Sequence, residues 1–251
     1  MNRVCYALTL LLIISSTPVF AGTTLDPLAE EATIVVAGTT VIYGGKISDQ
    51  GAGRFLDAVS GKKVAELIIA SSGGEVNAGM KMGEWVFDNH VDVVVERMCI
   101  SSCANYIFTA GRRKTINANS IVAWHGSLLQ PSGMSDEDVR TAVMESYRRL
   151  PESEQKKIDL QNMVIRTISQ MREYRVSSTA NQERFFRKIG VDEQICRIGN
   201  EKYGAKDAFL LSVEDMARFG VRDVVAPDEY EKIDLTPFRR NGKSIEFIKL
   251  K

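Results

Sequence analysis

The sequence predicts an α/β protein in which parallel strands are joined by helical crossovers. Short apolar, β-branched runs alternate with longer segments whose apolar residues recur at helical spacing. The repeating unit reads strand, strand, helix, which is typical of parallel strands with helices between them. Apolar residues make up 44% of the 251 residues, enough to build the core of one large domain.

The expected elements before residue 125 follow this pattern. The valine-rich run at 91–95 is typical of a strand buried on both faces. Residues 99–102 are expected to form a turn that leads into a short helix ending at Gly111. Expected strands lie at 33–36, 40–43, 64–70, 91–95, 115–116 and 121–124, and expected helices at 48–59, 75–89 and 103–110.

The pattern changes after residue 125, where a loop at 131–133 leads into charged, amphipathic helices. Two helices are expected at 135–150 and 152–174, separated by Pro151, and they form a helical insertion at about 135–175. Shorter elements are expected beyond it: helices at 181–189 and 213–219, and strands at 223–225 and 245–248. We expect residues 22–251 to form a single domain.

The first residues have the three regions of a secretory signal. Arg3 precedes an apolar run that a polar stretch ending in Pro18 interrupts, and Val19-Phe20-Ala21 offers small residues for a signal peptidase. A membrane anchor is the alternative, but the run is shorter than the about 20 apolar residues that cross a bilayer. We therefore expect residues 1–21 to be removed and the mature chain to be periplasmic or secreted.

Charge and cysteine content limit the ligands. Lys plus Arg and Asp plus Glu each number 32, so no basic excess favours nucleic acid. Only two histidines occur and no Cys-x-x-Cys motif is present, so we expect no metal site. In an oxidising compartment Cys99 and Cys103 are close enough in sequence to form a disulfide, leaving Cys196 free. Three buried cysteines are the alternative.

Ser102 is the candidate nucleophile. It lies in a tight turn after a buried strand and before a helix, where its hydroxyl is exposed at a sheet end and helical N–H groups can face an oxyanion. A helix N-cap serine would have the same local pattern.

His125 and a diglycine complete the pattern. His125 follows an apolar strand, and histidine is the usual base for a serine nucleophile, although it could instead bond the backbone. Gly73-Gly74 fits an oxyanion hole or a docking strand for substrate, or simply a left-handed turn.

From Thr40 to Val225 the chain resembles the proteolytic subunit of the Clp protease, ClpP, a relative of the crotonases. Its segments resemble that family's diglycine motif, nucleophile turn, histidine strand end and C-terminal Phe-Leu-Ser segment. In this sequence these are Ser71-Ser72-Gly73-Gly74, Ser101-Ser102-Cys103-Ala104, Val122-Ala123-Trp124-His125 and 209–221. A looser group of exported ClpP-like proteins shares the Cys-x-x-Ser-Cys turn.

The resemblance implies a ClpP/crotonase-like spiral of strand-strand-helix units with inserted helices. It implies Ser102 as nucleophile, His125 as base, and the N–H groups of Gly73 and Cys103 as the oxyanion hole, with Gly74 binding substrate. The family's triad acid falls near residue 204, and Asp207 is the nearest carboxylate. Glu201 or a Ser-His dyad are alternatives.

The sequence therefore favours a serine hydrolase that forms an acyl-enzyme on Ser102, and the resemblance implies a peptidase. The alternatives are a non-catalytic ClpP-like module that binds peptides or partners, and a variant in which Cys103 is the nucleophile. We expect a peptide or protein substrate and no cofactor. The inserted helices favour a homo-oligomer, with a lid as the alternative. An exported protein has no ATP supply, so we expect no ATPase partner.

Overall fold

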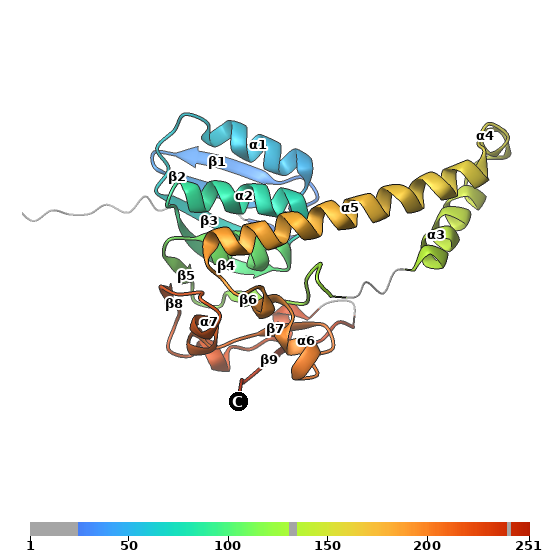
Figure 1. Ribbon diagram of the computed structural model, residues 1–251. Coiled ribbons are helices and arrows are strands. Elements are labelled where there is room, and N and C mark those ends of the chain that lie inside the picture. Colours follow the sequence, from blue (N-terminus) through green and yellow to red (C-terminus); the bar gives the residue numbers. More distant parts are fainter. Residues whose placement is uncertain (1–24, 131–134, 240–241) are drawn as a thin grey trace, which may run out of the picture.

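A computed structural model describes residues 25–130, 135–239 and 242–251. The expected signal peptide at 1–21 and the expected loop at 131–133 lie outside the described residues. The structure is mixed α/β with a mostly parallel sheet, as the sequence predicts at that level (Figure 1).

The described residues contain a main sheet of seven strands. Its order is β1-β2-β3-β4-β5-β8, and β6 pairs with β4 beside this path. The β1–β2 pair is an antiparallel hairpin, and the other pairings of this sheet are parallel. The strands are β1 (Thr33–Ala37), β2 (Thr40–Gly44), β3 (Glu66–Ser71), β4 (Asp92–Ile100), β5 (Lys114–Ile116), β6 (Ile121–Ala123) and β8 (Val224–Val225).

Strand β4 has two partners along one edge. Its first half pairs with β5 from Val93, and its second half pairs with β6, where Ile100 lies opposite Ala123. Between the halves Arg97 has a φ of 63°, and the register with β3 also shifts near this point. The strand therefore runs past the expected end at residue 95, and the expected turn at 99–102 is shorter because Cys99 and Ile100 are paired.

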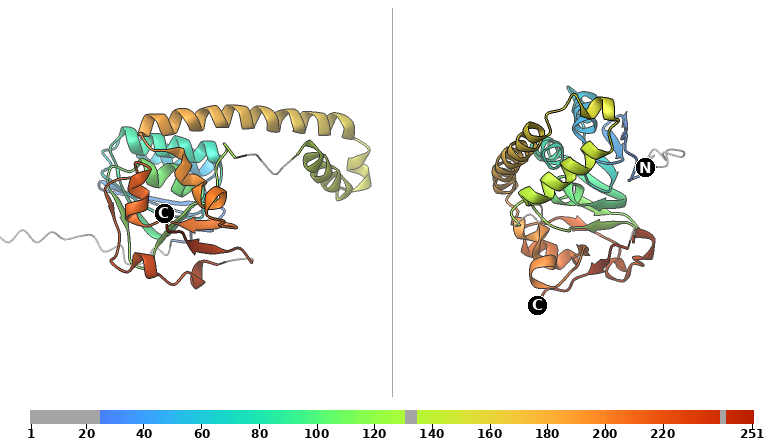
Figure 2. Two further views of the ribbon diagram at one scale, coloured as in Figure 1. Left: turned by 60° about the horizontal axis from the view of Figure 1, so that its bottom comes forward. Right: turned by 90° about the vertical axis from the view of Figure 1, so that its right-hand side faces the viewer.

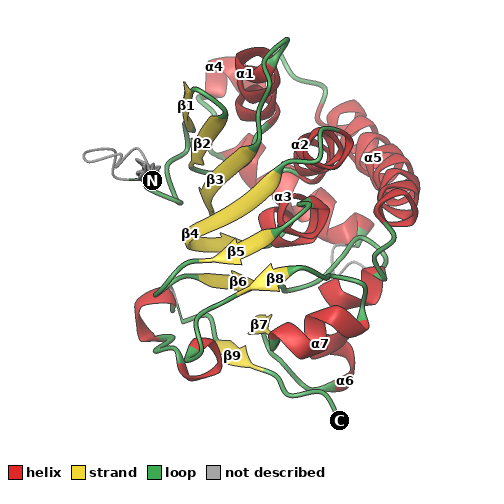
Figure 3. Ribbon diagram, turned by 90° about the vertical axis from the view of Figure 1, so that its left-hand side faces the viewer, coloured by secondary structure: helices red, strands yellow, loops and turns green. Residues whose placement is uncertain are grey.

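Helices cover one face of the sheet (Figure 3). Helix α1 (Asp49–Val59) begins at Ser48, whose hydroxyl accepts the Gly51 N–H, and α2 (Val76–Asp88) packs beside it. Phe55 and Leu67 are fully buried between helices and sheet. A smaller apolar cluster of Leu25, Ile42 and Ala70 covers part of the sheet away from this main core.

A helical arm projects from the core (Figures 1 and 2). It consists of α3 (Asp136–Arg148), α4 (Glu152–Gln155) and α5 (Leu160–Ile189), with α3 packed against α5. The expected boundary at residue 174 is wrong, because α5 contains no Gly or Pro and continues through the expected helix at 181–189. It ends at Gly190, which has a φ of 69°.

The C-terminal part adds a second, two-stranded parallel sheet of β7 (Ala208–Leu210) and β9 (Ile245–Phe247). Phe209 in β7 is also bridged to Trp124, which follows β6. The remaining elements are η1 (Cys103–Phe108), η2 (Glu193–Cys196), α6 (Ile198–Lys202), α7 (Val213–Arg218), η3 (Tyr230–Lys232) and η4 (Thr236–Phe238). Across the described ranges, no helix is long and apolar enough to span a bilayer.

Candidate active site

Ser102 lies at a sharp turn from strand to helix. Strand β4 ends at Ile100, Ser101 takes a φ of 60°, and Ser102 is already helical. A left-handed conformation costs a non-glycine residue about 1–2 kcal/mol, and here the Ser101 N–H is fixed by the carbonyl of Ala123 at 3.0 Å. The following element, η1, is π-helical, a geometry found frequently at functional sites.

The Ser102 hydroxyl is held by the diglycine segment. Its Oγ donates to the carbonyl of Gly74 at 2.8 Å, and the residue is only 2% exposed. Gly73 has a φ of 87°, and a Cβ there would lie 2.5 Å from the Ile100 carbonyl oxygen and 2.9 Å from the Ser102 nitrogen. Only glycine allows this close approach, so the diglycine directly positions the turn that carries Ser102.

One of the two N–H groups expected to form the oxyanion hole already has a hydrogen-bond partner. The Gly73 N–H donates to the hydroxyl of Ser71 at 3.1 Å, so in this state it is not free to bind an oxyanion. Cys103 is the first residue of η1, where N–H groups lack acceptors in their own helix. Of the two expected donors, the Cys103 N–H is therefore the one that no acceptor of its own helix holds, and Cys103 is fully buried.

His125 is fixed by the residues on either side of it. Trp124 exchanges two hydrogen bonds with Phe209, at 2.9 and 2.8 Å. The Gly126 N–H donates to the carbonyl of Cys196 at 2.8 Å, and the Gly126 carbonyl accepts from Asn105 Nδ2 at 3.1 Å. Since Asn105 belongs to η1, its side chain joins the helix that follows Ser102 to the loop that carries His125.

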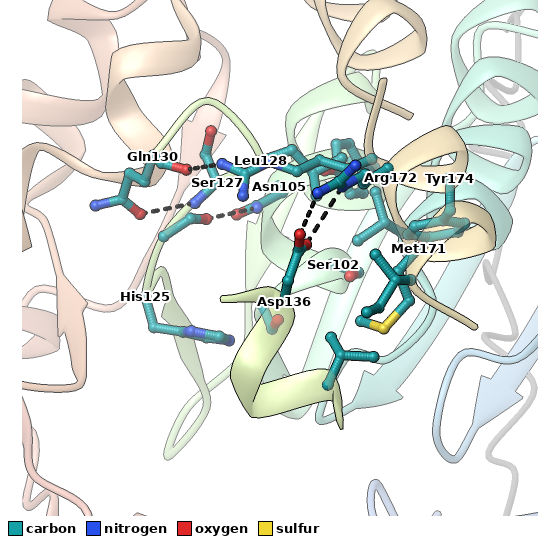
Figure 4. A pocket seen from close by; sticks show the side chains of 17 residues that line it. Ser102, Asn105, His125, Ser127, Leu128, Gln130, Asp136, Met171, Arg172 and Tyr174 are labelled. Atoms are coloured by element: carbon teal, nitrogen blue, oxygen red, sulfur yellow. Dashed lines mark hydrogen bonds and ion pairs between the residues drawn. The ribbon is translucent and has the colours of Figure 1, made fainter. Parts of the chain in front are cut away.

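Ser102 and His125 line the same cavity, which has a volume of about 550 Å³ (Figure 4). The register explains this, because β4 and β6 are parallel neighbours and both residues follow their carboxyl ends. Within the described residues no hydrogen bond joins the two side chains, since the serine hydroxyl is on Gly74. A hydrogen bond to the ring would require the serine hydroxyl to leave the Gly74 carbonyl.

The surroundings of His125 favour the neutral imidazole. Desolvation by the neighbouring protein is the largest effect and lowers the pKa of His125, and the charge of Lys243 lowers it further. The carboxylate of Asp207 acts in the opposite direction. A neutral imidazole at pH 7 is the form that accepts a proton from a serine.

Asp207 lies near His125 but is held by another residue. Its Oδ2 accepts from both the N–H and the hydroxyl of Ser244, at 2.8 and 3.1 Å, and these bonds lower the pKa of Asp207. Within the described residues no hydrogen bond joins Asp207 to the imidazole. Glu201, the alternative acid, is ion-paired with Arg197.

Cys99 and Cys103 form a disulfide that ties the end of β4 to the start of η1. The Cys103 thiol is therefore not available as a nucleophile in this state, and the cysteine-based alternative is set aside. Cys196 is free and buried, and desolvation raises the pKa of its thiol well above the ordinary value.

The arm contributes one wall of the cavity, which sequence reasoning did not find. The Asp136 carboxylate is ion-paired with Arg172 between α3 and α5 at this wall (Figure 4). Tyr174 donates to the Glu75 carboxylate at 2.6 Å, and Asn77 donates to Ser178 at 2.8 Å. Burial, followed by the bond to Glu75, raises the pKa of Tyr174 to about 12. These contacts fasten α5 beside the diglycine.

Within the described residues, no group of three or more His, Cys, Asp or Glu side chains is arranged to hold a metal ion. In comparisons with known proteins, no family model and no curated protein matches the chain.

Proposed function

We propose that this chain is a serine hydrolase, of the peptidase type, with Ser102 as nucleophile and His125 as general base. One observation carries the proposal: the two side chains follow adjacent parallel strands and line one cavity, and Ser102 stands at a left-handed strand-to-helix turn. The resemblance to ClpP supports a crotonase-like spiral and a peptide substrate.

In the proposed reaction the Ser102 hydroxyl leaves Gly74 and turns toward His125. The imidazole takes the hydroxyl proton while Oγ attacks the scissile carbonyl carbon, and the oxyanion is bound by the Cys103 N–H. The Gly73 N–H becomes a second donor when Ser71 releases it. The carbon–nitrogen bond breaks as imidazolium protonates the amine, and water, deprotonated by His125, then releases the acid and restores Ser102.

Asp207 is proposed as a positioning residue in this mechanism. Its negative charge favours the imidazolium that forms during the reaction, which is the electrostatic part of the role of a triad acid. Ser244 fixes its Oδ2, so the other carboxylate oxygen is the one available to the ring.

A labelling experiment tests the proposal. Purified mature protein is treated with a fluorescent fluorophosphonate, which phosphonylates activated serines. We expect labelling of the wild-type protein and of Ser177→Ala, a matched serine replacement on the exposed side of α5, and none of Ser102→Ala. His125→Ala should also lose nearly all labelling, since the members of such a unit act together. An unlabelled wild-type protein would contradict the hydrolase.

A peptide-binding module without catalysis is the second candidate. It is favoured by the hydrogen bond from Ser102 to Gly74, because a hydroxyl held there is not activated. This candidate predicts that peptides bind to the wild-type protein and to Ser102→Ala with equal affinity, while the wild-type protein fails to react with the fluorophosphonate.

We also propose that the chain is exported and that it forms a homo-oligomer. A disulfide beside the nucleophile is typical of an oxidising compartment and supports export to the periplasm or beyond. The arm carries exposed apolar side chains, including Ile165 at 67% and Val176 at 73% exposure, and these support a homo-oligomer formed through the arm. Light scattering that gives the mass of one chain at high concentration would contradict the oligomer.

A further inference from the structure

A second cavity, of about 470 Å³, adjoins the first through His125. The imidazole lines both, whereas Ser102 lines the first and Asp207 the second. The second cavity has an apolar part, formed by Met98, Ile100, Phe238 and Ile245, and a polar rim. The proposed catalytic residues do not require a space of this size beyond Asp207.

The charge of the second cavity is positive. Lys46, Lys206 and Lys243 line it, against the single carboxylate of Asp207. Lys46 is ion-paired with Glu30, and the charge of Lys243 interacts with the Asp207 carboxylate, although within the described part of the chain neither Lys206 nor Lys243 forms a direct salt bridge. The oxygen of Asp207 nearest Ser244 already accepts two hydrogen bonds. An anion in the cavity would therefore meet more ammonium groups than carboxylates.

The order of proton transfer places the leaving group beside His125, the residue that the two cavities share. The imidazole that deprotonates the nucleophile later protonates the leaving amine, so the leaving group must lie against His125. The leaving amine lies on the side of the ring that faces Ser102, and because His125 lines both cavities, the residues that follow the scissile bond can extend past the imidazole into the second one. The positive rim then selects their charge.

We propose that the cavity lined by Lys206 and Lys243 binds a carboxylate on the leaving-group side of a peptide substrate. The inference rests on the proposed hydrolase function and adds a substrate class to it. Lysine ammonium groups are mobile point charges, without the fixed fork of arginine. They can therefore bind either an acidic side chain or the carboxylate of a peptide terminus. The apolar part of the cavity would contact the carbon chain of the residue that carries this carboxylate.

Binding to Ser102→Ala protein tests the subsite apart from turnover. The probes are fluorescent alanine-rich hexapeptides in matched forms that carry Glu or Gln at one position, and a free or an amidated C-terminus. We expect the Glu form or the free-acid form to bind about tenfold more tightly than its neutral partner, the size expected for a hydrogen bond to a charged group. The preference should weaken as salt rises from low to physiological concentration.

Charge reversal identifies the residues involved. Lys206→Glu with Lys243→Glu should abolish or invert the preference for the acidic peptides. The matched control, Lys62→Glu with Lys63→Glu, makes the same charge change between α1 and β3 and should keep the preference. Equal binding of acidic and neutral peptides by Ser102→Ala protein, or loss of the preference in the control as well, would overturn the subsite.

The outcomes separate the subsite from the enzyme. Fluorophosphonate labelling without any preference for a carboxylate would leave the hydrolase standing and remove the subsite. A carboxylate preference that depends on Lys206 and Lys243, in a protein that does not label, would support the cavity as a binding site and contradict the hydrolase.

Discussion

Replacing Gly73 by alanine would press a methyl group into the nucleophile turn. The new Cβ would lie 2.5 Å from the Ile100 carbonyl oxygen and 2.6 Å from the Ser101 Cβ. Both neighbours belong to the end of β4 or to the turn after it, so no flexible side-chain end can move aside. The turn itself must shift.

The cost has two parts. A positive φ costs alanine about 1–2 kcal/mol, and overpacking in a tight site adds about 1–3 kcal/mol. Alanine also restricts the unfolded chain more than glycine does, which offsets about 0.4–1 kcal/mol of this cost. The expected loss of unfolding free energy is thus about 1–4.5 kcal/mol, which a domain of ordinary stability survives. A displacement of the turn by about 1 Å would reduce the reaction rate about 10²-fold.

Gly38→Ala is the matched control. Gly38 has a φ of 59° in the β1–β2 turn, and nothing lies within 4 Å of its added Cβ. Gly38→Ala should therefore carry the cost of the positive φ but not the cost of overpacking. Urea denaturation should show Gly73→Ala to be less stable than Gly38→Ala by about 1–3 kcal/mol, and fluorophosphonate labelling should slow only in Gly73→Ala. Equal stability and equal labelling rates would refute the close contact of the diglycine with the nucleophile turn.

Two further predictions concern the surroundings of the site, namely the pKa of His125 and the disulfide. Labelling should rise with pH as His125 loses its proton, with a midpoint below the ordinary histidine pKa because burial lowers the pKa of this residue. Lys243→Met removes a positive charge, which raises the pKa of His125 and should move the midpoint to higher pH. Asp207→Asn removes a negative charge and should move the midpoint to lower pH. A pH series of labelling rates in which both variants shift the midpoint in the same direction would contradict this arrangement. Replacing Cys99 and Cys103 together by alanine should lower the unfolding free energy by about 2 kcal/mol, the value expected for a short loop. Denaturation with and without dithiothreitol checks it, since the reductant should destabilise the wild-type protein and leave the double variant unchanged.

The parts of the fold that local patterns encode were predictable. Ser48 and the apolar spacing after it located α1, and the run at 91–95 located the first half of β4. The second half was missed because Glu96 and Arg97 interrupt the apolar run. That half is formed through pairing with β6, a contact that periodicity does not show.

The residues of the candidate site also fall into those that local sequence patterns predict and those that they do not. Ser102 and His125 follow strands with clear apolar signals, so their places at strand ends could be predicted. Tyr174 could not, because its partner Glu75 lies 99 positions away in the sequence. The length of α5 was missed, although residues 175–180 contain no Gly or Pro that would break a helix.

The two-stranded sheet of β7 and β9 has a consequence for how the site assembles. The sheet holds Asp207 through Ser244, and its ladder is three residues long and closes near the C-terminus. Ser102 belongs to a turn anchored in the large sheet and crosslinked by a disulfide. Short peripheral ladders open with smaller free energies than a central sheet. Amide hydrogens of 208–210 should therefore exchange sooner than those of 93–95, and Asp207 would come beside the Ser102 turn only in the last stage of folding.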